Sequence, residues 1–351
     1  MKQFFLFIGL VLIFLASCRK EELVGPELQD IFGEFAILET LSSDRETVDF
    51  AAGETVTFSA QLTVRTDWTI SIIGLTSGAR KEITGRDRDI QGEIANWDGT
   101  ITFAPLFGAE ECMTMMTFAN HPDTLLGDTI TVTSVKPEDS VDLLLSDFET
   151  GDGWGTFAEA AAQNIHVTGP YFVQDPQSET PAFIEVEAGE GVGHWRMTYA
   201  NQGSVFICGI NTTASASQGT PEGSTFDFEN NNPDHVYINL LVHGFGDGNT
   251  RLSIGLQEDD NLDGTYDRFT EGTYNTEILV DWVGWKVVSV PLSAFNLSTV
   301  GGFGNIDGTG QQDIDRILSI EFLLLAVEGT STQIGYGLDY INFTRFEPWN
   351  P

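Results

Sequence analysis

The chain has 351 residues, of which 52 are acidic and 16 basic, so its formal net charge is −36 at pH 7. So large a negative charge repels phosphate backbones and anionic lipid headgroups, which excludes the protein classes that bind nucleic acid or membranes by charge. The length is enough for about two domains, each able to bury a core, and the 25 Phe and 37 Gly favour strands and turns over helices.

The first segment of the chain predicts export. One lysine precedes an apolar run over residues 4–15, which is too short to span a bilayer and is typical of a signal-peptide core. The run ends in LASC at residues 15–18, which resembles a lipobox, the pattern at which bacterial lipoproteins are cleaved and lipidated. The resemblance implies a lipoprotein signal peptide over residues 1–17 and a lipid on Cys18. An ordinary secretory signal with a chance cysteine is the alternative.

Residues 18–30 are predicted to form a polar tether. The tether begins with RKEE at residues 19–22, which resembles the basic-then-acidic export signal of surface lipoproteins in glycan-foraging Gram-negative bacteria. This resemblance implies localisation to the outer membrane and exposure at the cell surface. The lipid would then be the protein's contact with the membrane, and outer-membrane glycan-uptake proteins would be its partners.

Residues 31–136 alternate short strand-like runs with turn residues. Every second residue of VTFSAQLTV, at 56–64, is apolar, which is typical of a half-buried sandwich strand. WTISIIG and NWDGTITF resemble bacterial Ig-like domains, and the resemblance implies an Ig-like β-sandwich, which we interpret as a spacer because the fold names no function. Trp68 and Trp97 are expected in its core or at a corner rather than on a ligand platform. KPEDS at residues 136–140 is the predicted linker.

A second domain is predicted over residues 141–347. DFE at 147–149, WKVVSVPLSAF at 285–295 and the closing segment around Asp339 resemble the galactose-binding-like jelly rolls of family 11 carbohydrate-binding modules. The resemblance spans this domain and implies a β-jelly-roll, so the whole chain is expected to be all-β: an N-terminal Ig-like β-sandwich followed by a jelly roll. It also implies a structural calcium site at Glu149 and Asp339.

EDDNLDGTYD, at residues 258–267, crowds five carboxylates into ten residues. Like charges this close repel one another unless water, a cation or a catalytic task compensates. Oxygen-bearing side chains at alternate positions, with Gly264 for a sharp turn, are typical of a calcium loop of the EF-hand type. However, Thr270 stands where the bidentate glutamate belongs, and Glu271 comes one residue late. A hairpin loop stapled by calcium (Ca²⁺) and a merely solvated acidic turn both stay open. The predicted calcium ligands are Asp259, Asn261, Asp263, Thr265 and Asp267.

The sequence carries no familiar catalytic motif. It contains no Gly-x-Ser-x-Gly elbow, no HExxH helix and no phosphate-binding glycine loop. A solvated turn at 258–267 also lacks the cleft and the raised pKa that a pair of glycosidase carboxylates needs. We therefore expect a protein that is not an enzyme, with a glycoside-active enzyme as the least favoured alternative.

Two strand-like segments suggest a sugar-binding face. VYINLLVH, at 236–243, and RLSIGLQ, at 251–257, each place apolar residues on one side and mixed polar and aromatic residues on the other. If the two strands pair, the second side offers the ring faces and planar polar groups that suit sugars. Alternatively this side is solvated or is covered by the first domain. The predicted ligand-binding residues are Tyr237, Asn239, His243, Arg251, Gln257, Trp154, Trp195, Tyr199 and Glu321.

Together these patterns predict a non-catalytic glycan-binding lipoprotein of the cell surface that captures extracellular polysaccharide or oligosaccharide. The alternative is a structural or adhesive surface lipoprotein that binds a protein partner or matrix. An aromatic strip along the binding face would favour sugar, whereas a broad, flat apolar patch would favour protein.

Overall fold

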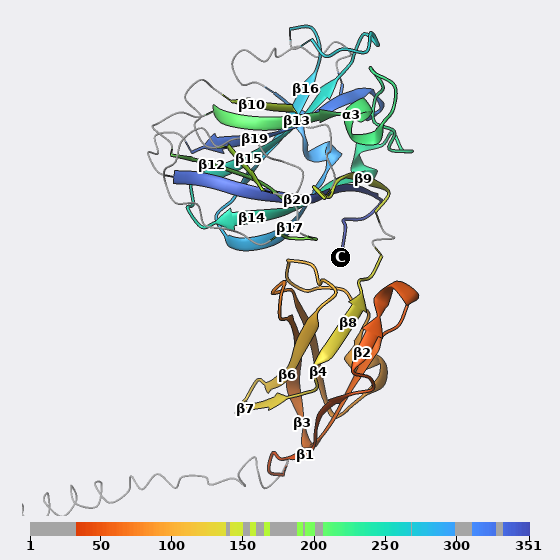
Figure 1. Ribbon diagram of the computed structural model, residues 1–351, viewed down its shortest axis with the longest axis vertical. Helices are drawn as coiled ribbons and strands as arrows, with labels where there is room; N and C mark the ends of the chain where they lie inside the picture. The colour runs from red at the N-terminus through yellow and green to blue at the C-terminus, as the bar shows by residue number, and fades with distance from the viewer. Residues whose placement is uncertain are drawn as a thin grey trace, which may run out of the picture.

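The computed structural model describes residues 33–137, 141–149, 155–158, 165–168, 188–191, 194–200, 206–267, 269–298, 311–327 and 333–351. Two bodies follow one another along the long axis of the molecule (Figure 1). Nearly all regular structure in the described residues is β-strand, and α3, Ala214–Gln218, is the one α-helix among them. The predicted all-β fold class is confirmed.

The first body is built on an eight-stranded sheet. Its main path runs β1-β3-β6-β8-β2, with β4 and β5 paired to β3 and β7 paired to β6. All of these pairs are antiparallel except β2 with β8. The strands are β1 (Ile37–Ser43), β2 (Thr47–Asp49), β3 (Val56–Gly74), β4 (Arg80–Ile90), β5 (Asn96–Trp97), β6 (Glu111–Phe118), β7 (His121–Leu126) and β8 (Ile130–Ser134), with 3-10 turns η1 (Phe50–Ala52) and η2 (Gly92–Ala95).

The strand alternation in β3 builds the core of the first body. Val56, Phe58 and Leu62 are buried there, as the period of two predicts. Trp68 is 2% exposed and Trp97 is 0% exposed, so the expectation that both tryptophans are core residues is confirmed. Full burial of side chains of this kind stabilises the fold by about 1.5–3 kcal/mol each.

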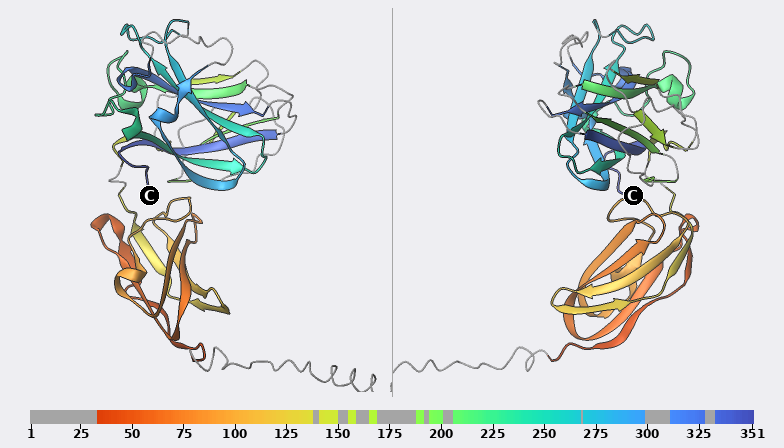
Figure 2. Two further views of the ribbon diagram at one scale, coloured as in Figure 1. Left: turned by 180° about the vertical axis from the view of Figure 1, so that it is seen from behind. Right: turned by 60° about the vertical axis from the view of Figure 1, so that its left-hand side comes forward.

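The second body is a sandwich of two six-stranded sheets. The near sheet, on the side of the first body, has the order β11-β12-β20-β14-β17 with β9 on β20, and the far sheet has the order β10-β13-β19-β15-β16-β18 (Figures 1 and 2). The strands are β9 (Leu143–Ser146), β10 (Gly155–Ala158), β11 (Ile165–Thr168), β12 (His194–Ala200), β13 (Phe206–Thr213), β14 (Val236–Phe245), β15 (Thr250–Glu258), β16 (Thr273–Leu279), β17 (Val283–Pro291), β18 (Asn296–Leu297), β19 (Ile317–Ala326) and β20 (Gln333–Arg345), with 3-10 turns η3 (Pro233–His235), η4 (Leu292–Ala294) and η5 (Ile314–Arg316).

The core of the second body lies between its two sheets. Apolar residues alternate into it from β14 in the near sheet and from β15 and β19 in the far sheet, and all of them are 0% exposed. They are Val236, Ile238, Leu240, Val242, Leu252, Ile254, Leu256, Ile320, Phe322 and Leu324. The inward sides predicted for residues 236–243 and 251–257 are therefore confirmed.

These two segments do not pair, so the condition for a shared sugar-binding face is not met. β14 pairs with β17 and β20, whereas β15 pairs with β16 and β19. The connection between them crosses from one sheet to the other, and in this crossing Asp247 Oδ1 accepts hydrogen bonds from the N–H groups of Asn249 at 2.7 Å and Thr250 at 2.8 Å. Because the core separates the two strands, their outward sides face away from each other and cannot form one surface.

The first body meets the outer side of the near sheet. Leu106 N–H donates to Gly189 O at 2.8 Å, and Ile101 N–H donates to Pro351 O at 3.1 Å. Val287, on β17, packs against the core of the first body. The predicted linker falls between β8 and β9, and the domain limits stay predictions.

Residues 1–32 lie outside the described part of the chain, so the signal peptide, the tether and the lipid on Cys18 stay predictions. Among the described helices, none combines the length and apolar character needed to cross a bilayer.

Candidate functional site

Asn239 does not reach the surface of the near sheet, because it is 0% exposed. Its Nδ2 donates to Asn342 Oδ1 at 3.1 Å and to Thr344 Oγ1 at 3.0 Å, and its Oδ1 accepts from Trp349 N–H at 3.2 Å. The amide therefore ties the segment at residues 349–351 to β14 and β20. The predicted role of Asn239 on an open ligand face is wrong, since this segment covers it.

Trp195 is also enclosed, and His243 is half-buried. Trp195 is 1% exposed and packs in the core between the sheets, so it offers no platform to a ligand. His243 lies on the outer side of β14, with its ring centroid 5.2 Å from that of Trp285. Burial, with a smaller contribution from the positive charge of Arg196, lowers the pKa of His243 to about 4. This histidine is therefore neutral at pH 7.

The chain itself covers much of the outer side of the near sheet. Segment 188–191 lies across it, because a Cβ atom built at Gly189 would stand 3.0 Å from the side chains of both Leu241 and Trp285. Tyr237, on the same side, is half-buried. Together with the contacts to the first body, this favours the alternative in which the first domain covers the face of β14.

The far sheet presents a different outer surface, which faces away from the first body (Figure 2). Strand register aligns Asn211, Glu321, Gly255 and Asn275 in one row across β13, β19, β15 and β16. Each of these residues has at least one chain neighbour in the core between the sheets, so the row itself points outward. A polar row thus crosses four adjacent strands.

Glu321 lies at the centre of this row. Gln257 Nε2 donates to Glu321 Oε2 at 3.2 Å. The Glu321 side chain lies over Gly255, where an added Cβ would stand 2.6 Å from Glu321 Cγ and Oε1. Only a residue without a side chain leaves this space, and burial of the carboxyl raises the pKa of Glu321 to about 7. Near neutral pH the Glu321 carboxyl therefore exists both protonated and ionised. The protonated form can donate a hydrogen bond, whereas the ionised form only accepts hydrogen bonds.

Four recessed polar side chains, which we call the polar floor, surround this position. Their exposed fractions are 1% for Ser253, 8% for Gln257, 3% for Ser319 and 7% for Glu321. Ser319 Oγ is buried without a hydrogen-bond partner. A hydroxyl, an amide and a carboxyl therefore lie together just beneath the outer surface of the far sheet, with little of their area open to solvent.

The rim of the polar floor is more exposed. Arg251 Nη1 pairs with Glu277 Oε2 at 2.9 Å, and Asn275 is half-buried. The structure thus brings three predicted ligand residues, Arg251, Gln257 and Glu321, to one face. Sequence reasoning missed Ser319 and Asn275 as candidates, although both stand at polar positions between inward-pointing residues of β19 and β16. Trp154 lies outside the described residues, and of Tyr199 only the backbone, in β12, is described.

The acidic loop uses its side chains to hold its own turn. Asp259 accepts from the N–H groups of Asp263 at 3.0 Å and Gly264 at 2.8 Å, and Asn261 Oδ1 accepts from Asp263 N–H at 2.8 Å. Asp263 Oδ1 accepts from Thr265 N–H at 3.0 Å. In the same way, Asp267 Oδ1 accepts from the N–H of Phe269, two residues after it, at 2.9 Å. Within the described residues, no three His, Cys, Asp or Glu side chains already form a group that could hold a metal ion. Calcium at this loop therefore stays a prediction.

The other predicted metal ligands, Glu149 and Asp339, both border segment 188–191. Asp339 is 0% exposed, and its Oδ2 accepts from the N–H groups of residues 189 and 190 at 2.8 and 2.9 Å. Burial raises the pKa of Asp339 well above its usual range. The carboxyl of Glu149 lies against Gly191, where an added Cβ would overlap it. The two acids thus come to one segment of backbone, and calcium there stays a prediction.

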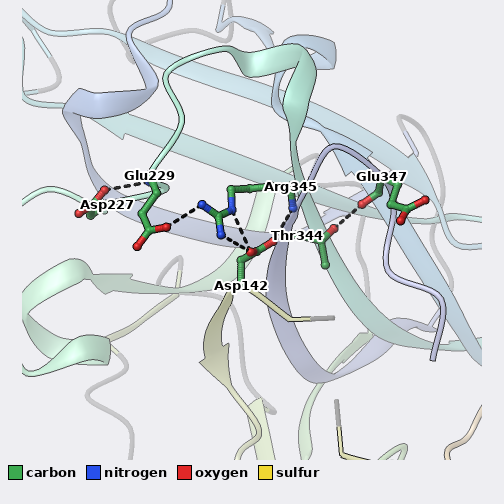
Figure 3. Close-up of polar contacts among 6 residues, drawn as sticks. All are labelled: Asp142, Asp227, Glu229, Thr344, Arg345 and Glu347. Atoms are coloured by element: carbon green, nitrogen blue, oxygen red, sulfur yellow. Dashed lines mark hydrogen bonds and ion pairs between the residues drawn. The ribbon is translucent and has the colours of Figure 1, made fainter. Parts of the chain in front are cut away.

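A charged cluster holds the start of the second body. Arg345 Nε and Nη2 donate to Asp142 Oδ1 at 2.8 and 2.6 Å, and Nη1 donates to Glu229 Oε2 at 2.6 Å (Figure 3). A hollow of about 150 Å³ lies beside this cluster, and Phe228 and Phe343 are among its lining residues. The guanidinium charge is already paired on both sides, so we assign the cluster a structural role in fastening β9 to β20.

The sequence matches no protein-family model. A comparison with curated proteins finds no match either. Among solved structures, the chain is similar to a family 11 carbohydrate-binding module from Clostridium thermocellum in complex with a β-1,3-1,4-mixed-linked tetrasaccharide. The two share 18% identity over 57% of this chain and 94% of that one, with a TM-score of 0.37. A family 30 carbohydrate-binding module gives 13% identity, coverage of 58% and 98%, and a TM-score of 0.34. An exo-β-agarase gives 13% identity, coverage of 59% and 26%, and a TM-score of 0.34. Likenesses this distant are too weak to transfer a ligand.

Proposed function

We propose that the protein binds extracellular polysaccharide or oligosaccharide, without cleaving it, through the outer face of the far sheet. The ligand class follows the resemblance of the sequence to carbohydrate-binding jelly rolls, and the polar floor selects the face. The observation that carries the proposal is the recessed carboxyl of Glu321, which lies over Gly255 beside the amide of Gln257. A buried acid with a raised pKa is costly to keep, and such groups concentrate at functional sites.

The chemistry of the floor suits sugar hydroxyls. Each hydroxyl both donates and accepts hydrogen bonds, and the floor offers groups of both kinds. No aromatic residue occupies an outward position of β15, β16 or β19 in the described part of the chain, so binding there relies on hydrogen bonds more than on stacking. We therefore expect weak affinity, about micromolar to millimolar, or about 4–8 kcal/mol. The aromatic strip that would favour sugar over a protein partner is thus not found at the described outward positions of these strands, and the polar groups of the floor support the sugar ligand instead.

The proposal includes the absence of hydrolysis. A glycosidase needs two carboxyl groups on opposite sides of the bond that it cleaves. Glu321 is a suitable acid, but the other carboxylate at a described outward position of β15, β16 and β19 that faces this row, Glu277, is exposed and paired with Arg251. This arrangement supports binding over catalysis.

We further propose that the lipid on Cys18 anchors the protein in the outer membrane, with the two domains exposed at the cell surface. β1 lies at the end of the first body that is remote from the second body (Figure 1). A chain anchored before β1 would therefore present the far sheet outward, where polysaccharide arrives. Outer-membrane glycan-uptake proteins are the proposed partners.

Affinity electrophoresis of the mature chain in gels that contain soluble polysaccharides tests the proposal. We expect at least one polysaccharide to retard the wild type, and Gln257→Ala and Glu321→Ala to lose this retardation while they still unfold in a single cooperative melting transition. Tyr237→Ala, on the near sheet, is the matched control and should be retarded like the wild type. Loss of retardation in Tyr237→Ala alone would move the site to the near sheet. Release of reducing ends during incubation would refute binding without catalysis.

A further inference from the structure

Three carboxylates are buried where the acidic loop leaves and rejoins the far sheet. The exposed fractions are 0% for Glu258, 2% for Asp259 and 1% for Glu271. Glu258 ends β15, Asp259 opens the loop, and Glu271 closes it just before β16. The loop therefore brings a third acid, Glu271, back to the place where it leaves the far sheet. Glu271 lies outside the calcium pattern found in the sequence.

Glu271 is held by backbone donors but keeps one oxygen open. Its Oε2 accepts from Asp267 N–H at 2.5 Å and the N–H of Asn261 also acts on the carboxylate, whereas its Oε1 is buried and has no hydrogen-bond partner. Asp259, by comparison, has both oxygens engaged by the N–H groups of Asp263 and Gly264. A buried carboxylate oxygen without a partner costs free energy unless something outside the described contacts compensates it.

Arg316, a described cation that contacts the loop, is already engaged elsewhere. Arg316 Nη1 donates to the backbone oxygen of Asp260 at 2.5 Å, and Arg316 Nε lies 3.6 Å from Asp313 Oδ2. Its charge is therefore directed at the backbone and at Asp313 rather than at the loop acids. With a net charge of −36, the chain as a whole offers few cations for this purpose.

We propose that this loop is a calcium site in which Glu271 supplies the carboxylate missing at the twelfth position, together with Asp259 and Asp263. A one-residue delay is accommodated because the backbone turns back over Asp267, whose carbonyl accepts from the N–H groups of Thr270 and Glu271, each at 3.0 Å. This turn directs Glu271 into the loop instead of past it. Calcium prefers oxygen ligands and tolerates irregular geometry, so rotation of the open Glu271 carboxyl toward the loop acids completes an oxygen-only set.

Thermal unfolding and titration calorimetry of the mature full-length chain, with CaCl₂ or with EDTA, test the site. Calcium at a hundredfold excess over its Kd should raise the melting temperature of the second domain by about 5–10 °C. Glu271→Gln should melt higher than the wild type in EDTA, because it removes a buried charge, and it should lose the calcium shift. With a purely structural glutamate, the variant would respond to calcium as the wild type does, because the amide oxygen of Gln still accepts from Asp267 N–H.

Two further variants keep the test decisive. Asp263 is exposed, so Asp263→Asn should fold normally, leave the EDTA melting temperature unchanged and weaken calcium binding at least tenfold. Asp315→Asn, at an exposed acid on the neighbouring turn η5, is the matched control and should change neither quantity. Wild-type protein that binds no calcium, or Glu271→Gln that keeps the full calcium shift, would overturn the proposal. A melting temperature that falls when Arg268 is replaced, but does not respond to calcium, would also overturn the proposal. The arginine would then be the group that compensates the buried carboxylates.

Discussion

Replacement of Glu321 by Gln measures how much the buried carboxylate of Glu321 lowers the free energy of unfolding. Burial raises the pKa of Glu321 from 4.5 to about 7. A shift of one unit corresponds to 1.36 kcal/mol, so the ionised carboxylate destabilises the folded state by about 3 kcal/mol. The folded protein holds this proton to a higher pH than the unfolded chain does. Its contribution to stability is therefore full below about pH 4.5, falls as the pH rises, and is lost above about pH 7.

The Glu321→Gln variant carries no titrating group at this position, so it should escape that loss. Urea unfolding of the second domain should give nearly equal stabilities for variant and wild type at about pH 4, and a variant that is more stable by about 3 kcal/mol at pH 8. Glu277→Gln, on the exposed rim, is the control and should show no such pH-dependent gain. A variant that is less stable than the wild type at pH 8, or a difference that does not change with pH, would refute the reasoning.

Three further predictions concern the two domains and the anchor. Glu110, 8% exposed, accepts from the N–H of Ser77 at 2.9 Å and from three further donors, so Glu110→Gln should lower the free energy of unfolding of the first domain by about 3 kcal/mol in urea. Unchanged unfolding would show that these contacts do not hold the domain. Val287→Asp should separate the two bodies and give them independent rotational correlation times by NMR relaxation, whereas Val283→Asp, at an 80% exposed position of the same strand, should not. Equal behaviour of the two variants would count against a packed interface. Cys18→Ala should abolish labelling by radioactive fatty acid and release the protein from the membrane fraction, and retained label would contradict the lipoprotein assignment.

Alternation along a strand could be predicted from the sequence, but the sheet to which each strand belongs could not. The apolar positions of residues 236–243 and 251–257 are inward as expected, because the period of two is a local property. The residues between these segments carry the chain across the core, from β14 in the near sheet to β15 in the far sheet. One crossing therefore separated Tyr237 from Arg251 and divided the predicted sugar face in two.

The burial of side chains that point away from the core also could not be predicted from the sequence pattern within one strand. Asn239 does point away from the core, but residues more than a hundred positions later cover it, through Trp349 and the pair with Asn342. Glu321 shows the converse, since its neighbours Ile320 and Phe322 already indicated an outward acid on β19. Its recessed position over Gly255 depends on strand register, which no pattern within one strand contains.

The central claim is that sugar binds the outer face of the far sheet. NMR titration of the mature, isotope-labelled chain with a soluble oligosaccharide that binds it locates the contact directly. Binding at the polar floor predicts the largest chemical-shift changes at the amides of Ser253, Gln257, Ser319 and Glu321, with little change at Tyr237. Changes concentrated at Tyr237 and its neighbours on β14, with the far sheet undisturbed, would contradict the account.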